Sequence, residues 1–150
     1  MKRNSKFSLA LHALGHMAVR PDRPMTSELI ADHNATNPVV VRRVLGLLRE
    51  AGLLTSEKGH AGGWSLARPA AEIKLSDVYK AVGEPFLMRN AGGEDNPPHC
   101  AIERALHHTV DIALADAEAL LVERLASRSV EELAAALSRP GAQTRGEGPG

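Results

Sequence analysis

The segment TNPVVVRRVLGLLREAGLL, residues 36–54, narrows the possible folds more than any other part of the sequence. Asn37 can cap a helix, and Pro38 suits the first helical position because its missing N–H is not needed there. Gly52 is a typical residue just beyond a helix end. The segment therefore predicts one helix of about three turns between these two signals.

The two faces of this predicted helix differ sharply in character. Apolar residues recur at the i, i+3, i+4, i+7 spacing of an inward-facing stripe, which comprises Val41, Val44, Leu45 and Leu48. The opposite face carries Val39, Arg42, Arg43, Gly46 and Arg49. A basic outer face on a single helix is often only a solvated surface, so its meaning depends on the flanking elements.

The flanking segments predict a definite order of elements. A first helix is expected over about residues 7–18, and a short second helix follows the N-cap Thr26, with Asn34 expected to take the left-handed conformation at its end. After the third helix, two short strands at 53–56 and 64–67 flank a glycine-rich turn, which is typical of a hairpin. We therefore expect a mainly α fold with a small β-hairpin wing, a winged helix-turn-helix.

This order of elements is the one that presents a helix to the major groove of DNA. The net charge is zero, yet residues 1–68 hold ten Lys or Arg against five Asp or Glu, and residues 69–150 hold eight against thirteen. Chance clustering could give the same asymmetry, but a DNA-binding half joined to an acidic half would also show it. The hairpin tip adds Lys58 and His60 among glycines, which let a backbone approach DNA closely.

The sequence resembles the Rrf-two family of bacterial winged-helix regulators in FSLALHALGHMA, NPVVVRRVLGLLREAGLL, KGHAGGWSLAR and KLSDVYKAVGEP, over roughly residues 5–137. The resemblance implies a homodimeric regulator of transcription that binds double-stranded DNA, and we expect a repressor at a palindromic operator. It places Asn37, Val39 and Arg42 at base-reading positions and Lys58 in the wing. Including their neighbours, the predicted DNA-contacting residues are Thr36, Asn37, Val39, Val40, Arg42, Arg43, Lys58 and His60.

Residues 101–127 contain neither Gly nor Pro and predict a helix about 40 Å long at 1.5 Å per residue. One apolar stripe comprises Ile102, Leu106, Val110, Ala113, Ala117 and Leu121, and a second comprises Ala105, Ile112, Ala119, Val122 and Ala126. We expect the rest of the chain to cover one stripe and a second copy of the chain to cover the other. The alternative is a helix that lies wholly inside one domain.

The remaining segments complete the predicted organisation. A short helix should be capped by Ser76 and end at Gly83, and a last helix should begin with a capping box between Ser129 and Glu132. The predicted units are a DNA-binding domain at 1–82, a sensory loop at 83–100, dimerisation helices at 101–138 and a disordered tail at 139–150.

Cys100, the only cysteine, precedes the long helix, where free N–H groups and the helix dipole favour a thiolate. A lone cysteine is more often a small buried hydrophobe, so a reactive thiol and an inert one both stay open. By the resemblance, Cys100 matches the last of three cysteines in cluster-binding relatives, and Glu103 stands at their histidine ligand. Two of the three cysteines are absent, so an iron–sulfur cluster is not expected. A metal site of Cys100, His12, His99 and Glu103 stays open.

Other classes of protein find little support. The sequence shows no C-x-x-C, no phosphate-binding loop and no run of about 18 apolar residues, so we expect neither an enzyme nor a membrane protein. No signal segment is evident at the N-terminus, and we expect a cytoplasmic protein. The predicted function is a DNA-binding regulator that responds through Cys100. The alternatives are a regulator with an inert Cys100 that responds to a small molecule or metal, and a thiol-redox or metal-handling module.

Overall fold

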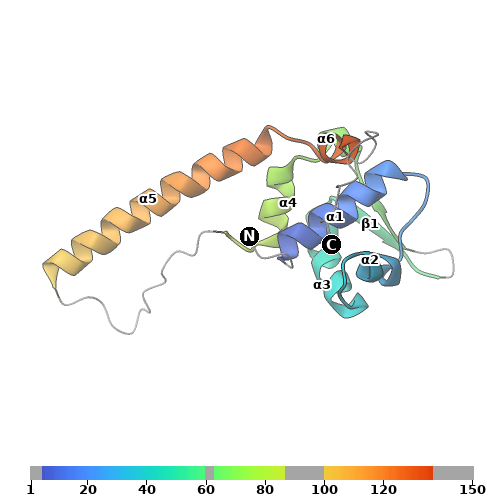
Figure 1. Ribbon diagram of the computed structural model, residues 1–150, viewed down its shortest axis with the longest axis horizontal. Coiled ribbons are helices and arrows are strands. Elements are labelled where there is room, and N and C mark those ends of the chain that lie inside the picture. The colour runs from blue at the N-terminus through green and yellow to red at the C-terminus, as the bar shows by residue number, and fades with distance from the viewer. Residues whose placement is uncertain (1–4, 60–62, 87–99, 137–150) are drawn as a thin grey trace, which may run out of the picture.

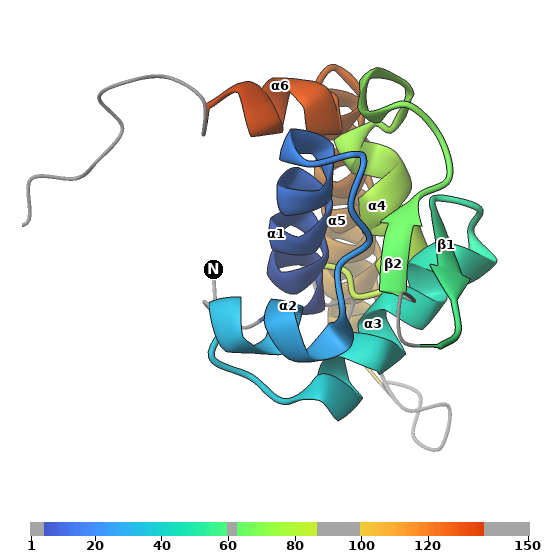
Figure 2. The same cartoon turned by 90° about the vertical axis from the view of Figure 1, so that its right-hand side faces the viewer.

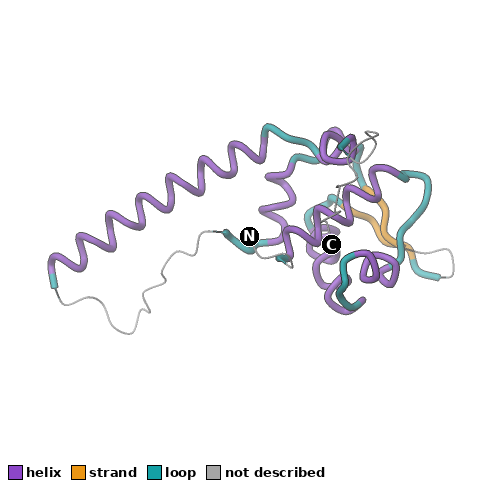
Figure 3. The backbone as a smooth tube through the Cα atoms, in the orientation of Figure 1, coloured by secondary structure: helices purple, strands orange, loops and turns teal. Residues whose placement is uncertain are grey.

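The computed structural model describes residues 5–59, 63–86 and 100–136. Figures 1 and 3 show a body of short helices with a two-stranded hairpin, from which one long helix extends. His60, His99, the predicted tail at 139–150 and most of the predicted sensory loop lie outside the described residues. The elements are α1 (Lys6–Val19), α2 (Ser27–His33), α3 (Pro38–Glu50), β1 (Leu54–Glu57), β2 (Gly63–Leu66), the 3-10 turn η1 (Ala70–Glu72), α4 (Leu75–Val82), α5 (Ala101–Ala126) and α6 (Val130–Ala135).

The core lies where α1 and α3 meet the shorter elements. The predicted inward stripe of α3 is confirmed, because its four members are all buried: Val41, Val44, Leu45 and Leu48. From α1, Leu14 and Met17 are buried in the same cluster. Asn37 accepts a hydrogen bond from the Val40 N–H at 3.0 Å, so α3 begins at the predicted cap. The outer face of α3 is thereby directed away from the body.

The turn between α2 and α3 differs from the prediction by one residue. Asn34 stays at φ −108°, and its side-chain amide donates to the Ile30 carbonyl at 2.8 Å. Ala35 takes the left-handed conformation instead, at φ 50°. The N–H groups of Ala35 and Thr36 then bond to carbonyls of the last turn of α2, which is the Schellman arrangement. The prediction that Asn34 takes the left-handed conformation is wrong, because Asn34 is the C-cap residue and its side chain bonds to a carbonyl of α2.

The hairpin forms one residue later than expected on its first strand. Leu54 pairs with Leu66 and Glu57 with Gly63 in an antiparallel register. Met25, just before α2, extends the ladder, since it exchanges two backbone hydrogen bonds with Trp64 at 3.0 and 2.8 Å. The hairpin is therefore attached to the helix-turn-helix by its own backbone.

The short helix α4 begins earlier than predicted. Its N-cap is Lys74, whose N–H donates to the Asp77 carboxylate at 3.0 Å. Ser76 lies inside the helix and is buried, so the predicted Ser76 cap is wrong. The physical reason is tertiary, because the Leu75 N–H donates to the carbonyl of Arg128, in the distant segment between α5 and α6. Gly83 ends the helix at φ 68°, as predicted.

The long helix α5 confirms its predicted length but not its predicted burial. None of its residues is buried, and Ile102, Leu106 and Ile112 are 80%, 59% and 51% exposed. Its C-terminal part alone packs on the core, through Leu121, Val122 and Leu125. Figure 1 shows why, since only the end of α5 nearest α4 lies against the body. Among the described residues no element covers either stripe along its whole length, contrary to the expectation that the rest of the chain covers one.

The last helix, α6, folds back onto the body. Figure 2 shows it across one end, with α2 and α3 near the other. Val130 is fully buried, and its N–H donates to the Ile73 carbonyl at 2.9 Å. Ser129 accepts from the Glu132 N–H at 3.2 Å, which is one half of the predicted capping box. The Glu132 carboxylate instead faces Arg128, at 3.9 Å.

Candidate nucleic-acid interface

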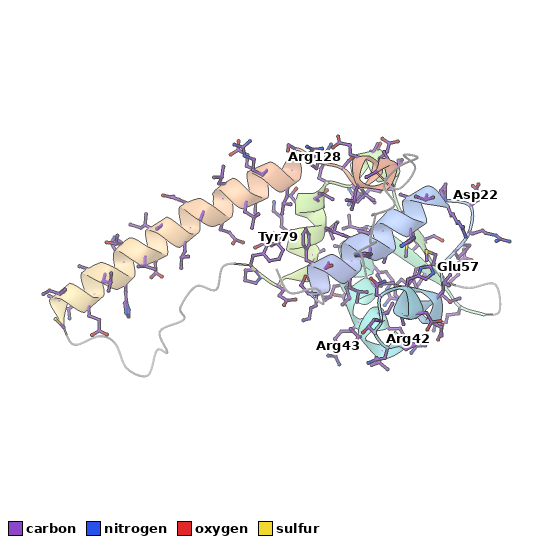
Figure 4. All side chains as sticks on the ribbon, in the orientation of Figure 1. Asp22, Arg42, Arg43, Glu57, Tyr79 and Arg128 are labelled. Carbon is purple, nitrogen blue, oxygen red and sulfur yellow. The ribbon has the colours of Figure 1, made fainter. Side chains whose placement is uncertain are left out.

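The outer face of α3 carries most of the residues predicted to contact DNA. Val39 is 61% exposed, and Val40, Arg42 and Arg43 are exposed beside it. Figure 4 shows Arg42 and Arg43 at the same edge of the body. Thr36 is half-buried at the turn, and Asn37 is exposed. A short exposed helix face that combines apolar and guanidinium groups can contact thymine methyls, guanine edges and phosphates.

Arg42 has a partner on the preceding helix. Its Nη2 donates to Glu28 Oε1 at 2.7 Å, while the two side chains remain 54% and 61% exposed. Glu28 lies in the first turn of α2, where Thr26 accepts a hydrogen bond from the Leu29 N–H at 3.2 Å. The pair joins the two helices of the helix-turn-helix on their outer side. No sequence pattern predicts this pair, because the turn geometry decides which residues of α2 face α3.

A second arginine of α3 is used to attach the wing. Arg49 Nη1 donates to Ser56 Oγ at 2.9 Å, and its guanidinium carbon lies 5.6 Å from the centre of the Trp64 ring. The indole N–H of Trp64 donates in turn to Ser27 Oγ at 2.9 Å in a buried bond. Arg49 therefore links α3 to the hairpin, and the hairpin is linked to α2. These contacts fix the position of the wing relative to α3.

The wing residues are only partly described. Lys58 follows β1 and is exposed, so its ammonium group is free to meet an anionic surface. His60 lies outside the described residues. The exposed side of α3 and the base of the wing together form a basic surface, to which Arg42, Arg43 and Lys58 contribute.

Cys100 is the N-cap of α5, at the other end of this helix from the part that packs on the core. It is exposed, and the N–H groups of Glu103 and then Ile102 lower the pKa of its thiol below the ordinary value. The first turn of α5 offers unpaired donors, which stabilise the thiolate more than water stabilises that of an ordinary exposed cysteine. The buried position usual for a lone cysteine does not hold here, and both a reactive and an inert thiol remain compatible with this exposed position.

The residues around Cys100 do not fit a cysteine-ligated cluster. The sequence contains one cysteine, whereas such a cluster needs about four ligands, so the donor set is missing. Within the described ranges no three His, Cys, Asp or Glu side chains come together as a metal site. His12 is exposed on α1, and Glu103 is one turn into α5. The fourth candidate, His99, lies outside those ranges.

Two other histidines come together without any signal in the sequence. The rings of His16 on α1 and His33 on α2 lie 5.1 Å apart. Partial burial, followed by the charges of His33, His12 and Arg20, lowers the pKa of His16. The pair marks the contact between α1 and the first helix of the helix-turn-helix.

An aromatic cluster lies at the joint between the body and α5. Tyr79 donates to Glu118 at 2.8 Å and accepts from the Phe86 N–H at 3.2 Å. Phe7 contacts Tyr79 and Phe86 edge-on, at 5.6 and 5.4 Å between ring centres. Burial and the bond to Glu118 raise the pKa of Tyr79 above its ordinary value. The orientation of α5 is thereby tied to α1 and α4.

The fold and this basic surface define a winged helix-turn-helix regulator of transcription. The Rrf2 family model, described as an iron-dependent transcriptional regulator, matches residues 3–136. The chain belongs to this family, which confirms the Rrf-two resemblance and the expected fold. In the described residues no helix is long and apolar enough to cross a membrane.

Relatives and solved structures agree with this assignment. YwnA of Bacillus subtilis (strain 168), which carries the name of an HTH-type transcriptional regulator, is 35% identical over 130 residues, covering 87% of this chain and 95% of YwnA. A crystal structure described as a DNA-binding protein is 32% identical, with a TM-score of 0.69 over 86% of this chain and 98% of its own. The oxidized form of Staphylococcus aureus CymR is 26% identical, with a TM-score of 0.60 over 89% and 96% of the two chains.

Proposed function

We propose that this chain is a homodimeric, sequence-specific repressor that reads a palindromic DNA operator. The observation that carries the proposal is the exposed face of α3, with Val39, Arg42 and Arg43 directed outward from a helix whose other face is fully buried. In each protomer α3 would enter the major groove, and the wing with Lys58 would reach the adjacent minor groove. Thr36, Asn37, Val40 and His60 would complete the contacts.

The dimer would form along α5. Its N-terminal part exposes large apolar side chains, with Ile102 at 80% and Leu106 at 59%, and the described part of the chain does not cover them. A twofold axis along two such helices would bury these stripes against each other and set the spacing of two reading heads. Such a protein would act where the chromosome is, in the cytoplasm, and would not be an enzyme.

The signal would act through Cys100. Its exposed position and lowered thiol pKa support oxidation, alkylation or persulfidation at this sulfur. The thiol stands at the N-terminus of the same helix that would form the dimer, so a change there would reach the two reading heads. That a relative, CymR of Staphylococcus aureus, has an oxidized form gives this route further support. An iron–sulfur cluster forms no part of the proposal.

The alternative is a regulator with an unreactive Cys100 that responds to a small molecule or metal. Operator binding by wild type and Cys100→Ser, each with and without peroxide, inorganic polysulfide, iron or zinc, separates the two. A response that Cys100→Ser abolishes supports the thiol switch, whereas equal responses contradict it.

The DNA-binding proposal is tested with duplex DNA from upstream of the protein's own gene. Purified protein should shift this duplex, and the logarithm of its affinity should fall linearly with the logarithm of salt concentration. A reporter driven by the same region should lose expression when the protein is supplied. Absence of any shift at low salt would contradict DNA binding, and increased reporter expression would contradict repression.

A further inference from the structure

One ion pair on the outer face of the helix-turn-helix contributes too little to stability for its presence to be explained by the fold alone. Arg42 Nη2 and Glu28 Oε1 lie 2.7 Å apart, the shorter of the two ion pairs among the described residues. Both side chains are more than half exposed, and exposed pairs contribute little to stability because water and salt screen them. A carboxylate on a surface that meets phosphates also repels DNA. Glu28 therefore adds little to stability and lowers general affinity for DNA.

The bond restricts how Arg42 can be presented. A guanidinium group is planar and carries five N–H donors in a fixed fork. Glu28 engages one N–H of Nη2, which leaves the second Nη2 N–H and its neighbour on that edge of the guanidinium as a two-donor edge in a plane that the carboxylate orients. Guanine offers O6 and N7 in the major groove, and an arginine reads both with two donors. An arginine held in one orientation loses less side-chain entropy when it makes such a contact.

We propose that Glu28 is a positioning residue for base specificity, acting by orienting Arg42 toward a guanine and by offsetting its charge toward phosphates. The proposal rests on the proposed function, since it assumes that α3 reads DNA. It assigns two opposite effects to one carboxylate. Glu28 lowers affinity for unrelated DNA, and it raises the discrimination of one G·C pair in the operator.

The test compares specific and unspecific binding in the full chain. Wild-type protein selects duplexes from a random library, and dissociation constants are measured for the selected operator, for a scrambled duplex and for operators with each base pair replaced. The matched control is Asp32→Asn, which removes one exposed carboxylate one turn further along α2. Arg42→Ala identifies the base pair that Arg42 reads.

We expect Glu28→Gln to lower the ratio of specific to unspecific affinity about three- to tenfold, a part of what a complete arginine–guanine contact gives. The loss should be confined to the pair that Arg42→Ala also loses, while affinity for the scrambled duplex is unchanged or tighter. Asp32→Asn should keep the wild-type ratio. Glu28→Gln added to Arg42→Ala should cause no further loss of specificity.

The outcomes distinguish failure of the positioning role of Glu28 from failure of DNA reading by α3. If Glu28→Gln keeps the full ratio, or weakens every duplex and every base pair equally, the positioning role is wrong and DNA reading by α3 still stands. A purely structural role would give that uniform weakening together with a lower melting temperature. If the wild type enriches no sequence, the proposed function itself fails.

Discussion

Helices α2 and α3 end in the same backbone arrangement with different residues at its left-handed position. Beyond α2 this position is Ala35, at φ 50°, and beyond α3 it is Gly52, at φ 76°. In both, two successive N–H groups bond back to the last turn of the helix. An L side chain in this conformation is strained, whereas glycine is not. The turn that sets the angle between α2 and α3 therefore stores strain that the end of α3 avoids.

Exchange of these two residues should have opposite effects on stability. Ala35→Gly should raise the free energy of unfolding by about 0.5–1 kcal/mol, since relief of strain exceeds the added entropy of the unfolded chain. Gly52→Ala should lower it by about 1 kcal/mol, because a Cβ there meets no atom within 4 Å and only the backbone cost remains. Urea denaturation measures both. Equal destabilisation by the two changes would contradict this account.

The thiol of Cys100 gives a pH-dependent prediction. Because backbone N–H groups lower its pKa, the thiolate persists to lower pH in the folded chain than in the unfolded one. The rate of alkylation by iodoacetamide should therefore reach half its plateau at a lower pH in native protein than in the same protein in urea. A higher midpoint in the native protein would be inconsistent with a sulfur stabilised by the start of α5.

At the scale of elements, the wing is held by three separate links. Its strand β2 bonds to Met25 through the backbone, Trp64 bonds to Ser27, and Arg49 bonds to Ser56. Gly63 permits the first of these, since a Cβ there would lie 2.8 Å from the Met25 carbonyl oxygen. The position of the wing relative to α3 is thus determined within the domain, before any DNA is met.

Gly63→Ala should disturb this attachment. We expect a loss of about 1–3 kcal/mol in the free energy of unfolding, the usual cost of forcing an extra carbon into a filled site. Gly46→Ala is the control, because a Cβ there meets no atom within 4 Å in mid-helix and should be neutral or stabilising. Thermal unfolding of both variants checks the difference. A Gly63→Ala protein as stable as the Gly46→Ala protein would show that the strand can move aside freely.

At the scale of the whole molecule, the long helix α5 extends from the body with apolar residues exposed on it. Leu106→Glu should convert a dimer into a monomer, because the introduced carboxylate would have to be desolvated between two helices. His107→Glu, at the next exposed position, should leave the dimer intact. Analytical ultracentrifugation gives the masses. A wild-type protein that is monomeric at micromolar concentration, or a Leu106→Glu protein that remains dimeric, would contradict the role of α5.

The sequence predicts those features of the molecule that are determined by residues close together in the sequence. The α3 stripe, its Asn37 cap and its Gly52 end follow from helical period and capping chemistry, and the structure confirms them. The N-cap of α4 at Lys74 did not follow, because it depends on a hydrogen bond that the Leu75 N–H donates to the Arg128 carbonyl. The bond between Tyr79 and Glu118 spans 39 positions and depends on the direction of α5. The pairing of Glu28 with Arg42 was not predicted for the same reason, because it depends on the geometry of the turn between α2 and α3.

The roles of the surface residues are tested by a comparison of two arginines. Figure 4 shows Arg42 at the edge formed by α2 and α3, and Arg128 near α6 on the other side of the body. Both are exposed, and each faces one glutamate. Removal of either arginine changes the net charge by the same amount. Because the two differ in location, only removal of Arg42 alters the proposed reading face.

Fluorescence anisotropy with the upstream duplex therefore gives the most direct test of the central claim, that the outer face of α3 reads DNA. Arg42→Ala should weaken binding by about 1–3 kcal/mol and relax discrimination at one base pair. Arg128→Ala should bind as the wild type does. If Arg42→Ala binds as tightly and as selectively as the wild type, or if the two variants lose affinity equally, α3 is not the reading helix.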